Sequence, residues 1–168
     1  AWMCHVPTVC HESDLTPGLA NRICAKFAWR VAATFPECAR ALGEKGVMTG
    51  TPLRPELFQG SRAAGLALAG FDGRKPVLLM TGSNTLSELL ALHKPMMLVP
   101  YPLGASRGDQ IENAKSYQRQ GLAHVLMQED MTPETLTQSL LELLAQRQEL
   151  VKVLEAYPVK DGTDAVLE

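Results

Sequence analysis

The sequence predicts an α/β fold with parallel sheets, because short apolar segments alternate with segments of helical periodicity. Three apolar segments, at residues 6–10, 30–35 and 46–49, are separated by helix-like sequence. This β-α-β-α-β order is typical of parallel strands joined by crossover helices. The alternation resumes after residue 50 and is organised around residues 81–114. We therefore expect parallel strands on both sides of residue 50.

The composition is that of an ordinary globular protein. Of the 168 residues, 46% are hydrophobic and 20% are charged, and the formal net charge is -2. That charge provides no basic surface for nucleic acid, so we expect no nucleic-acid partner. No segment approaches the run of about 20 apolar residues that a membrane-spanning helix needs. Four cysteines are too few for a disulfide scaffold, which favours a reducing cytoplasm.

The N-terminal elements are predicted from spacing and from proline. A helix is expected at residues 19–27, where apolar side chains recur at helical spacing. A second helix is expected at residues 36–42, beginning with Pro36, which suits a first helical turn. The Gly-Thr-Pro sequence at residues 50–52 interrupts the alternation. We predict a domain boundary there, with residues 1–50 forming the first domain.

The C-terminal elements follow in the same rhythm, and residues 51–157 form the second predicted domain. The long last helix has a strong start, because Thr132 can cap it and Pro133 and Glu134 suit its first turn. Residues 158–168 are predicted to be a tail. The remaining elements predicted on this side are a helix at 62–69, strands at 77–80, 96–100 and 123–127, a helix from Asp109, and the last helix at 131–157.

The segment 81–114 opens on a Gly-Ser-Asn-Thr turn that leads into a helix. Unpaired backbone N–H groups at such a turn attract anions, and Gly82 lets the backbone approach a phosphate closely. Ser83 and Thr85 add hydroxyl donors. Glu88 lies one turn further on, where a carboxylate can hold two sugar hydroxyls. We interpret this stretch as a nucleotide-sugar site.

Three polar groups elsewhere allow two interpretations. His11 and Glu12 follow a predicted strand and could form part of a site or cap the turn. Arg54 could hold a diphosphate bidentately or be an ordinary surface arginine. By contrast, the adjacent cysteine–histidine pairs lack metal-ligand spacing, so we predict no metal site. At the helix that starts at Asp109, Gln110 and Asn113 share a face, which is consistent with sugar binding or with plain capping by Asp109.

Four sequence motifs resemble the MurG family, the UDP-N-acetylglucosamine:undecaprenyl-pyrophosphoryl-muramoylpentapeptide N-acetylglucosaminyltransferases. The resemblance implies a GT-B fold of two Rossmann-like domains, with the nucleotide-sugar donor held by the C-terminal domain and the lipid-linked acceptor by the N-terminal one. It implies an inverting hexosyltransferase of peptidoglycan synthesis that needs no cofactor and associates peripherally with the inner face of the cytoplasmic membrane. The motifs are HESDLTPGLANR (11–22), VMTGTPLR (47–54), GSNTLSELLALHKPMMLVP (82–100) and DQIENA (109–114).

The resemblance also implies roles for individual residues. Arg54 matches the arginine that contacts the diphosphate, and Glu88 matches the glutamate that binds the ribose. Gln110 and Asn113 match the pair that faces the N-acetylglucosamine. The remaining matches are Ser83, Asn84 and Thr85 in the diphosphate loop, and His11 and Glu12 facing the interdomain cleft as candidate catalytic residues.

The sequence departs from the family in two places. The family's N-terminal glycine-rich loop and its histidine are absent, so the main general base is expected outside this chain. A second gap falls at residues 81–83, where two similar Gly-Ser turns look fused and part of the uracil pocket should be missing. We therefore expect a truncated GT-B protein that is itself inactive. The alternatives are a non-catalytic nucleotide-sugar-binding fragment, or a related glycosyltransferase with a different acceptor.

Overall fold

The first sheet lies in the N-terminal part of the chain. The computed structural model describes residues 1–78, 85–103 and 108–158. Strands β1 (Val9–Glu12), β2 (Arg30–Ala33) and β3 (Gly46–Met48) are parallel and lie in the order β1-β2-β3. The predicted parallel arrangement is therefore confirmed. The first strand starts three residues later than predicted, so His11 and Glu12 belong to it rather than following it.

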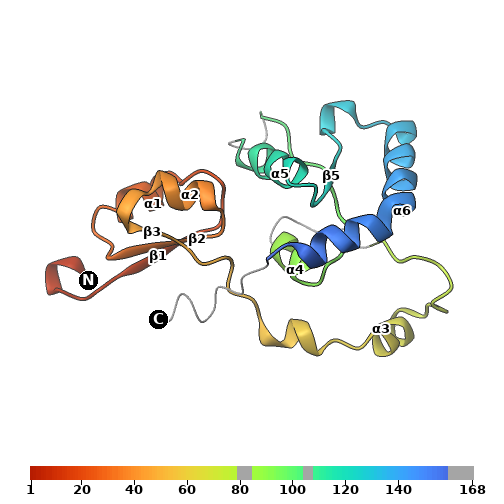
Figure 1. The fold of residues 1–168 in the computed structure, drawn as a ribbon, viewed down its shortest axis with the longest axis horizontal. Helices are drawn as coiled ribbons and strands as arrows, with labels where there is room; N and C mark the ends of the chain where they lie inside the picture. Colours follow the sequence, from red (N-terminus) through yellow and green to blue (C-terminus); the bar gives the residue numbers. More distant parts are fainter. Residues whose placement is uncertain (79–84, 104–107, 159–168) are drawn as a thin grey trace.

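Two helices, α1 (Leu19–Cys24) and α2 (Pro36–Ala41), lie on the same side of this sheet (Figure 1). Helix α2 begins with proline as predicted. Helix α1 is shorter than predicted and contains no buried residue. Its apolar stripe stays open to solvent, since Leu19 is 68% exposed and Ile23 is 52% exposed. Two short 3-10 helices, Trp2–Cys4 and Gly43–Lys45, complete this part.

The second sheet is formed by β4 (Met97–Leu98) and β5 (His124–Val125), which are parallel. Around it lie α4 (Leu86–Ala91), α5 (Asp109–Arg119) and α6 (Pro133–Ala156), with a 3-10 helix at Gln128–Asp130 (Figure 1). Thr132 caps α6 as predicted, because its side chain accepts a hydrogen bond from the Thr135 N–H. On α6, Leu143, Leu150 and Leu154 are buried.

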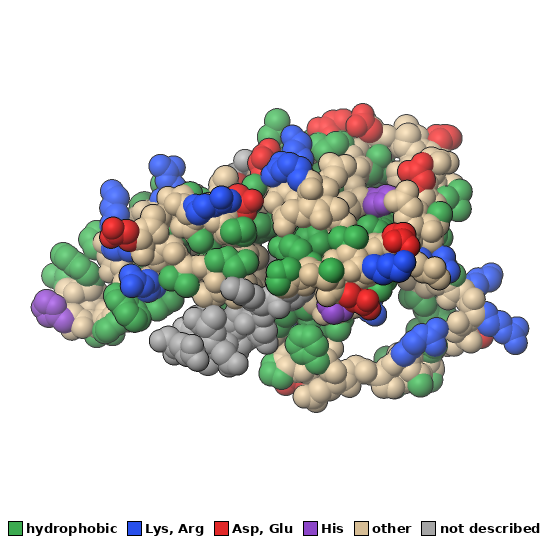
Figure 2. Space-filling model, in the orientation of Figure 1, with side chains coloured by type: hydrophobic (Ala, Val, Ile, Leu, Met, Phe, Trp, Pro, Cys, Tyr) green, Lys and Arg blue, Asp and Glu red, His purple; other side chains and the backbone are tan. Residues whose placement is uncertain are grey.

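Between the two sheets runs an arm, residues 54–78, in which no residue is buried. It contains a 3-10 helix at Pro55–Gln59 and helix α3 (Arg62–Ala69), which has the predicted bounds. Figure 1 shows α3 extending away from both sheets, and Figure 2 shows open space beside it. The strand predicted at 77–80 is wrong for residues 77 and 78, which form no strand and are about 60% exposed. A strand needs a neighbour for its backbone groups, and neither sheet formed by the described residues includes Val77 or Leu78.

One hydrophobic core joins the two sheets. It contains Phe35, which follows β2, and Tyr117 on α5, whose rings meet edge to face with centroids 5.9 Å apart. Packing of this kind links the N-terminal sheet directly to the C-terminal helices. The buried members of the core are Ala33, Phe35, Cys38, Leu90, Met96, Leu98, Ala114, Tyr117, Leu122, Ala123 and Leu154.

Within the described part of the chain, no helix has the length and apolar character needed to cross a membrane.

Candidate functional site

Two residues singled out from the sequence meet at the start of α4. The Arg54 Nη2 lies 2.6 Å from the Glu88 Oε1, although 34 residues separate them in the chain. Glu88 belongs to the first turn of α4 and is 22% exposed at its side chain, whereas Arg54 is 75% exposed. A guanidinium and a carboxylate thus lie together at the N-terminal end of α4. The guanidinium suits a phosphate, and the carboxylate suits sugar hydroxyls.

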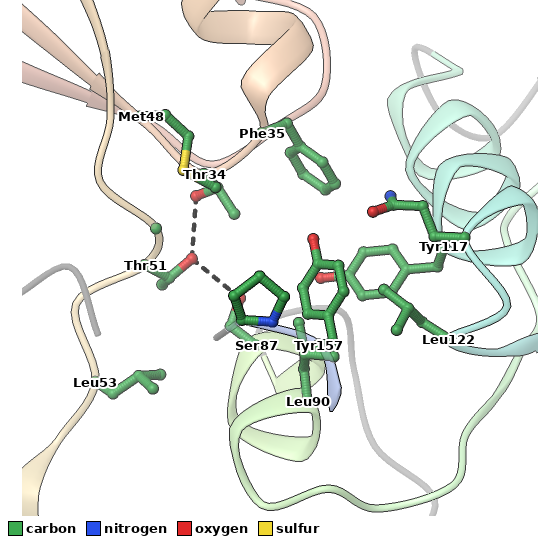
Figure 3. Close-up of a pocket in the computed structure, with 13 residues that line it drawn as sticks. Thr34, Phe35, Met48, Thr51, Leu53, Ser87, Leu90, Tyr117, Leu122 and Tyr157 are labelled. Atoms are coloured by element: carbon green, nitrogen blue, oxygen red, sulfur yellow. Dashed lines mark hydrogen bonds between the residues drawn. The ribbon is translucent and has the colours of Figure 1, made fainter. Parts of the chain in front are cut away.

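A chain of hydroxyl groups lies beside this pair and connects the two sheets. The Thr51 hydroxyl is 3.0 Å from that of Thr34, which follows β2, and 3.0 Å from that of Ser87 on α4 (Figure 3). Tyr117 lines the same space as Ser87 (Figure 3). Burial, together with the neighbouring Tyr157, raises the pKa of Tyr117 to about 12. Tyr117 therefore stays protonated near neutral pH, and the two hydroxyl contacts of Thr51 hold the chain in place at that residue.

The same residues line a small cavity of about 40 Å³. Figure 3 shows Phe35, Tyr117 and Tyr157 on one side and Thr34, Thr51 and Ser87 on another. A cavity needs roughly 10–15 Å³ to hold one water molecule, so this space suits a few waters and not a nucleotide. The nucleotide-sized part of any site must therefore lie outside it.

Glu12 is almost fully buried, with 5% of its surface exposed, and binds the turn that follows β1. Its Oε2 accepts hydrogen bonds from the Gly18 N–H at 2.8 Å and the Asn21 side chain at 3.0 Å, and its Oε1 accepts from the Asp14 N–H at 3.2 Å. Burial alone would raise the pKa of Glu12, but these hydrogen bonds outweigh it and hold the pKa below its ordinary value. A carboxylate of lowered pKa is a weak base, so the geometry favours a positioning role for Glu12.

His11 lies next to Glu12, and its ring contacts the turn at residue 50. The His11 Nε2 donates a hydrogen bond to the Gly50 carbonyl at 3.1 Å, which leaves Nδ1 without the proton in the neutral ring. This contact fixes the ring against the turn at residue 50. Among the residues that the structure describes, no three His, Cys, Asp or Glu side chains gather closely enough to hold a metal ion.

The predicted sugar-facing pair lies on the first turns of α5. That helix starts after Gly108, whose φ of 86° lies in the left-handed region that glycine adopts without strain. The Gln110 Oε1 accepts a hydrogen bond from the Tyr101 N–H at 3.3 Å. Asn113 reaches the other sheet: its Oδ1 accepts from the Leu15 N–H at 2.9 Å, and its Nδ2 donates to Asp14 at 3.0 Å.

The structure therefore brings some of the predicted residues together. Arg54 and Glu88 meet, and Asn113 contacts the turn held by Glu12. Thr85 lies at the N-terminus of α4. The predicted loop residues Gly82, Ser83 and Asn84 lie outside the described residues.

Sequence reasoning missed the hydroxyl chain through Thr34, Thr51 and Ser87, and it missed the contact between Asp14 and Asn113. The two residues of that contact are 99 positions apart. No periodicity or short motif indicates such a pair. Ser87 carried a weak signal, since it stands directly before Glu88 in the segment that was singled out.

Comparison with known proteins agrees with this architecture. The family model described as the glycosyltransferase family 28 C-terminal domain matches residues 80–165. A UDP-N-acetylglucosamine--N-acetylmuramyl-(pentapeptide) pyrophosphoryl-undecaprenol N-acetylglucosamine transferase of Clostridium kluyveri is 31% identical, over 99% of this chain and 67% of its own length. The transferase of the same name from Geobacillus kaustophilus is 32% identical, over 99% of this chain and 66% of its own length.

The chain spans about two thirds of the length of these curated relatives. The alignment with the Clostridium kluyveri protein covers 237 positions, 69 more than the 168 residues of the chain. Positions of the relative therefore have no counterpart here even though nearly the whole chain is aligned. This agrees with the expectation of an internal gap.

The solved structure of Acinetobacter baumannii MurG has a similar fold. It matches 98% of this chain and 66% of its own chain with a TM-score of 0.64, at 16% sequence identity. The two parallel sheets are accordingly a shortened arrangement of the GT-B type. On the family match and the curated relatives, the chain belongs to the MurG family of glycosyltransferases, which are hexosyltransferases.

Proposed function

We propose that the region around Arg54, Glu88, Gln110 and Asn113 is the donor side of a transferase site and binds UDP-N-acetylglucosamine. The observation that carries this proposal is the 2.6 Å contact between Arg54 and Glu88 at the start of α4. Both residues were assigned to the donor from sequence motifs, one to the diphosphate and one to the ribose. Their meeting supports a common ligand, and the curated relatives are named for transfer of N-acetylglucosamine.

In this proposal the donor separates Arg54 from Glu88 and binds each of the two side chains. The Arg54 fork turns to two oxygens of the diphosphate, and the Glu88 carboxylate accepts hydrogen bonds from two ribose hydroxyls. Because Arg54 is 75% exposed, its bond to Glu88 is a surface ion pair. Such pairs contribute about 0–1 kcal/mol, so a ligand displaces one at little cost.

The acceptor in the proposed reaction is a lipid-linked muramoyl-pentapeptide, as the names of the relatives state for those proteins. The acceptor hydroxyl attacks the anomeric carbon with inversion while Arg54 stabilises the departing diphosphate. Because Glu12 has a lowered pKa and His11 is bonded to Gly50, we place the main general base outside this chain. The chain by itself is therefore proposed to bind donor without turnover.

A membrane-facing surface is part of this proposal. Helix α1, the turn after it and the segment before β1 leave several apolar side chains exposed, and Arg22 and Lys26 lie among them in sequence. An apolar surface flanked by cations suits the interface of an anionic membrane. It supports peripheral association with the inner face of the cytoplasmic membrane. The exposed side chains are Trp2, Met3, Val6, Leu19, Ile23 and Phe27.

The test is isothermal calorimetry with UDP and with uridine. We expect Glu88→Gln to weaken UDP binding about tenfold to a hundredfold, since hydrogen bonds to a charged group contribute about 1.5–3 kcal/mol. Arg54→Lys should weaken the binding of UDP and leave uridine unchanged, because only the fork that matches the diphosphate is lost.

Arg74→Lys is the matched control, since Arg74 is also an exposed arginine paired with a carboxylate, at 3.7 Å. It should change neither affinity. Absence of UDP binding by the unsubstituted chain would contradict the proposal. Binding of a different nucleotide in place of UDP would favour the alternative function, a related glycosyltransferase that acts in another nucleotide-sugar pathway.

A further inference from the structure

Asn113, the proposed sugar-facing amide of α5, is held by a turn that belongs to the other sheet. Its Nδ2 donates to the Asp14 carboxylate at 3.0 Å, and its Oδ1 accepts from the Leu15 N–H at 2.9 Å. Asn113, Asp14 and Leu15 are all partly buried. The turn after β1 and the first half of α5 are therefore joined through a single carboxamide.

These two contacts fix which way the carboxamide faces. A carboxamide has two N–H donors and an oxygen with two lone pairs, and the turn uses one donor and one lone pair. Rotating the amide by half a turn would put its oxygen against the Asp14 carboxylate and its NH₂ against the Leu15 N–H. Both hydrogen bonds would be lost, so one orientation is strongly favoured. Within the described part of the chain, one N–H and one lone pair of known position remain for a ligand.

The turn that sets this orientation is itself held by a buried group. Glu12 binds the N–H of Asp14 at 3.2 Å and the N–H of Gly18 at 2.8 Å, one from each end of the turn. Glu12 is 5% exposed and lies on β1, within the first sheet. Asp14 and Leu15 are consequently presented to α5 from a fixed support.

We propose that Asp14 is a positioning residue for sugar recognition. It orients Asn113 so that the remaining N–H and lone pair of the amide bind a hydroxyl of the donor sugar. This inference rests on the proposed function, because it requires Asn113 to face that sugar. Its consequence is that a residue of the turn after β1 influences how much affinity the sugar adds to the nucleotide.

The experiment compares UDP-N-acetylglucosamine with UDP by calorimetry and uses the ratio of their dissociation constants. Asp14→Ala should reduce the advantage of the sugar nucleotide about two- to tenfold, the equivalent of one ordinary hydrogen bond, and leave UDP unchanged. Asp14→Asn should restore the advantage, since its Oδ1 still accepts from Asn113. Asp72→Ala, on the exposed arm, is the matched control and should change neither constant.

A second measurement checks the contact without ligand. Asn113→Ala should speed hydrogen exchange at the Leu15 N–H and leave exchange at the Gly18 N–H, which is bound to Glu12, unchanged. An unchanged ratio in Asp14→Ala, or an equal loss for both ligands, would overturn the positioning role alone. Failure of the unsubstituted chain to bind UDP would overturn the proposed function and this inference together.

Discussion

The turn at residues 13–18 and the arm at residues 54–78 are both connecting segments, yet the structure holds them very differently. The turn is bound at both ends by the buried Glu12 and touched from the other sheet by Asn113. The arm contains a complete helix, α3, but no buried residue, and Leu68 on that helix is 92% exposed. A segment is fixed in this protein where it contacts both sheets, and not merely where it has regular secondary structure.

The exposed arm also closely precedes residues 81–83, where the sequence departs from the family. The alignment with the Clostridium kluyveri relative has 69 more positions than this chain has residues. We propose that the missing positions fall after the arm, near residues 81–83, where two similar Gly-Ser turns look fused in the sequence.

The largest effect is expected at the contact between the two sheets. Tyr117→Ala removes a ring that is 4% exposed and packs edge to face against Phe35. We expect the free energy of unfolding to fall by about 3–5 kcal/mol, as for other large aromatic truncations. Urea denaturation measures it. Tyr117→Phe keeps the ring and its contact with Phe35, so it should lose much less. Equal losses for the two variants would show that packing is not the cause.

A smaller effect is expected at the turn. Glu12→Ala leaves the Asp14 N–H, the Gly18 N–H and the Asn21 amide without their acceptor. The expected loss is about 1–3 kcal/mol of unfolding free energy, because water reaches part of the turn. Glu112→Ala, at an exposed pair with Lys115, is the control and should change little. If both variants were equally stable, the buried carboxylate would not be what holds the turn.

Glu12 also makes the stability of the fold depend on pH. Because the pKa of Glu12 is lower in the folded protein than its ordinary value of 4.5, the charged form stabilises the fold above that pH. This contribution is lost as the pH falls through the lower, folded pKa. The unfolding free energy of Glu12→Gln should therefore fall less than that of the unsubstituted chain when the pH is lowered from about 6 to about 3. These two pH values lie on either side of the ordinary pKa of a glutamate. Parallel curves would contradict the assignment.

The smallest effect is expected on the arm. Leu68→Ser exchanges an exposed leucine for a polar residue without removing a packing contact. Unfolding free energy should stay within about 0.5 kcal/mol of the original, as for other surface changes. A loss comparable to that of Tyr117→Ala would mean that α3 is covered in solution, and the comparison between arm and turn would then be wrong.

Local signals predicted much of the fold. The bounds of α3, the proline at the start of α2 and the Thr132 cap all depend on residues a few positions apart. The strand at 77–80 was predicted from its apolar run, and that prediction failed for residues 77 and 78 because a strand depends on a distant neighbour. For the candidate site, motifs indicated Arg54 and Glu88, whereas Asp14 had no signal because its partner is 99 residues away.

Hydrogen–deuterium exchange with and without UDP-N-acetylglucosamine tests the donor site most directly. At saturating ligand, we expect slower exchange in α4, in the first turns of α5 and in the turn at 13–18, with α3 unchanged. These segments carry Glu88, Gln110, Asn113 and Asp14, whereas α3 carries no proposed ligand-binding residue. Unchanged exchange in α4 and α5 at a concentration where calorimetry shows binding would contradict the proposed site.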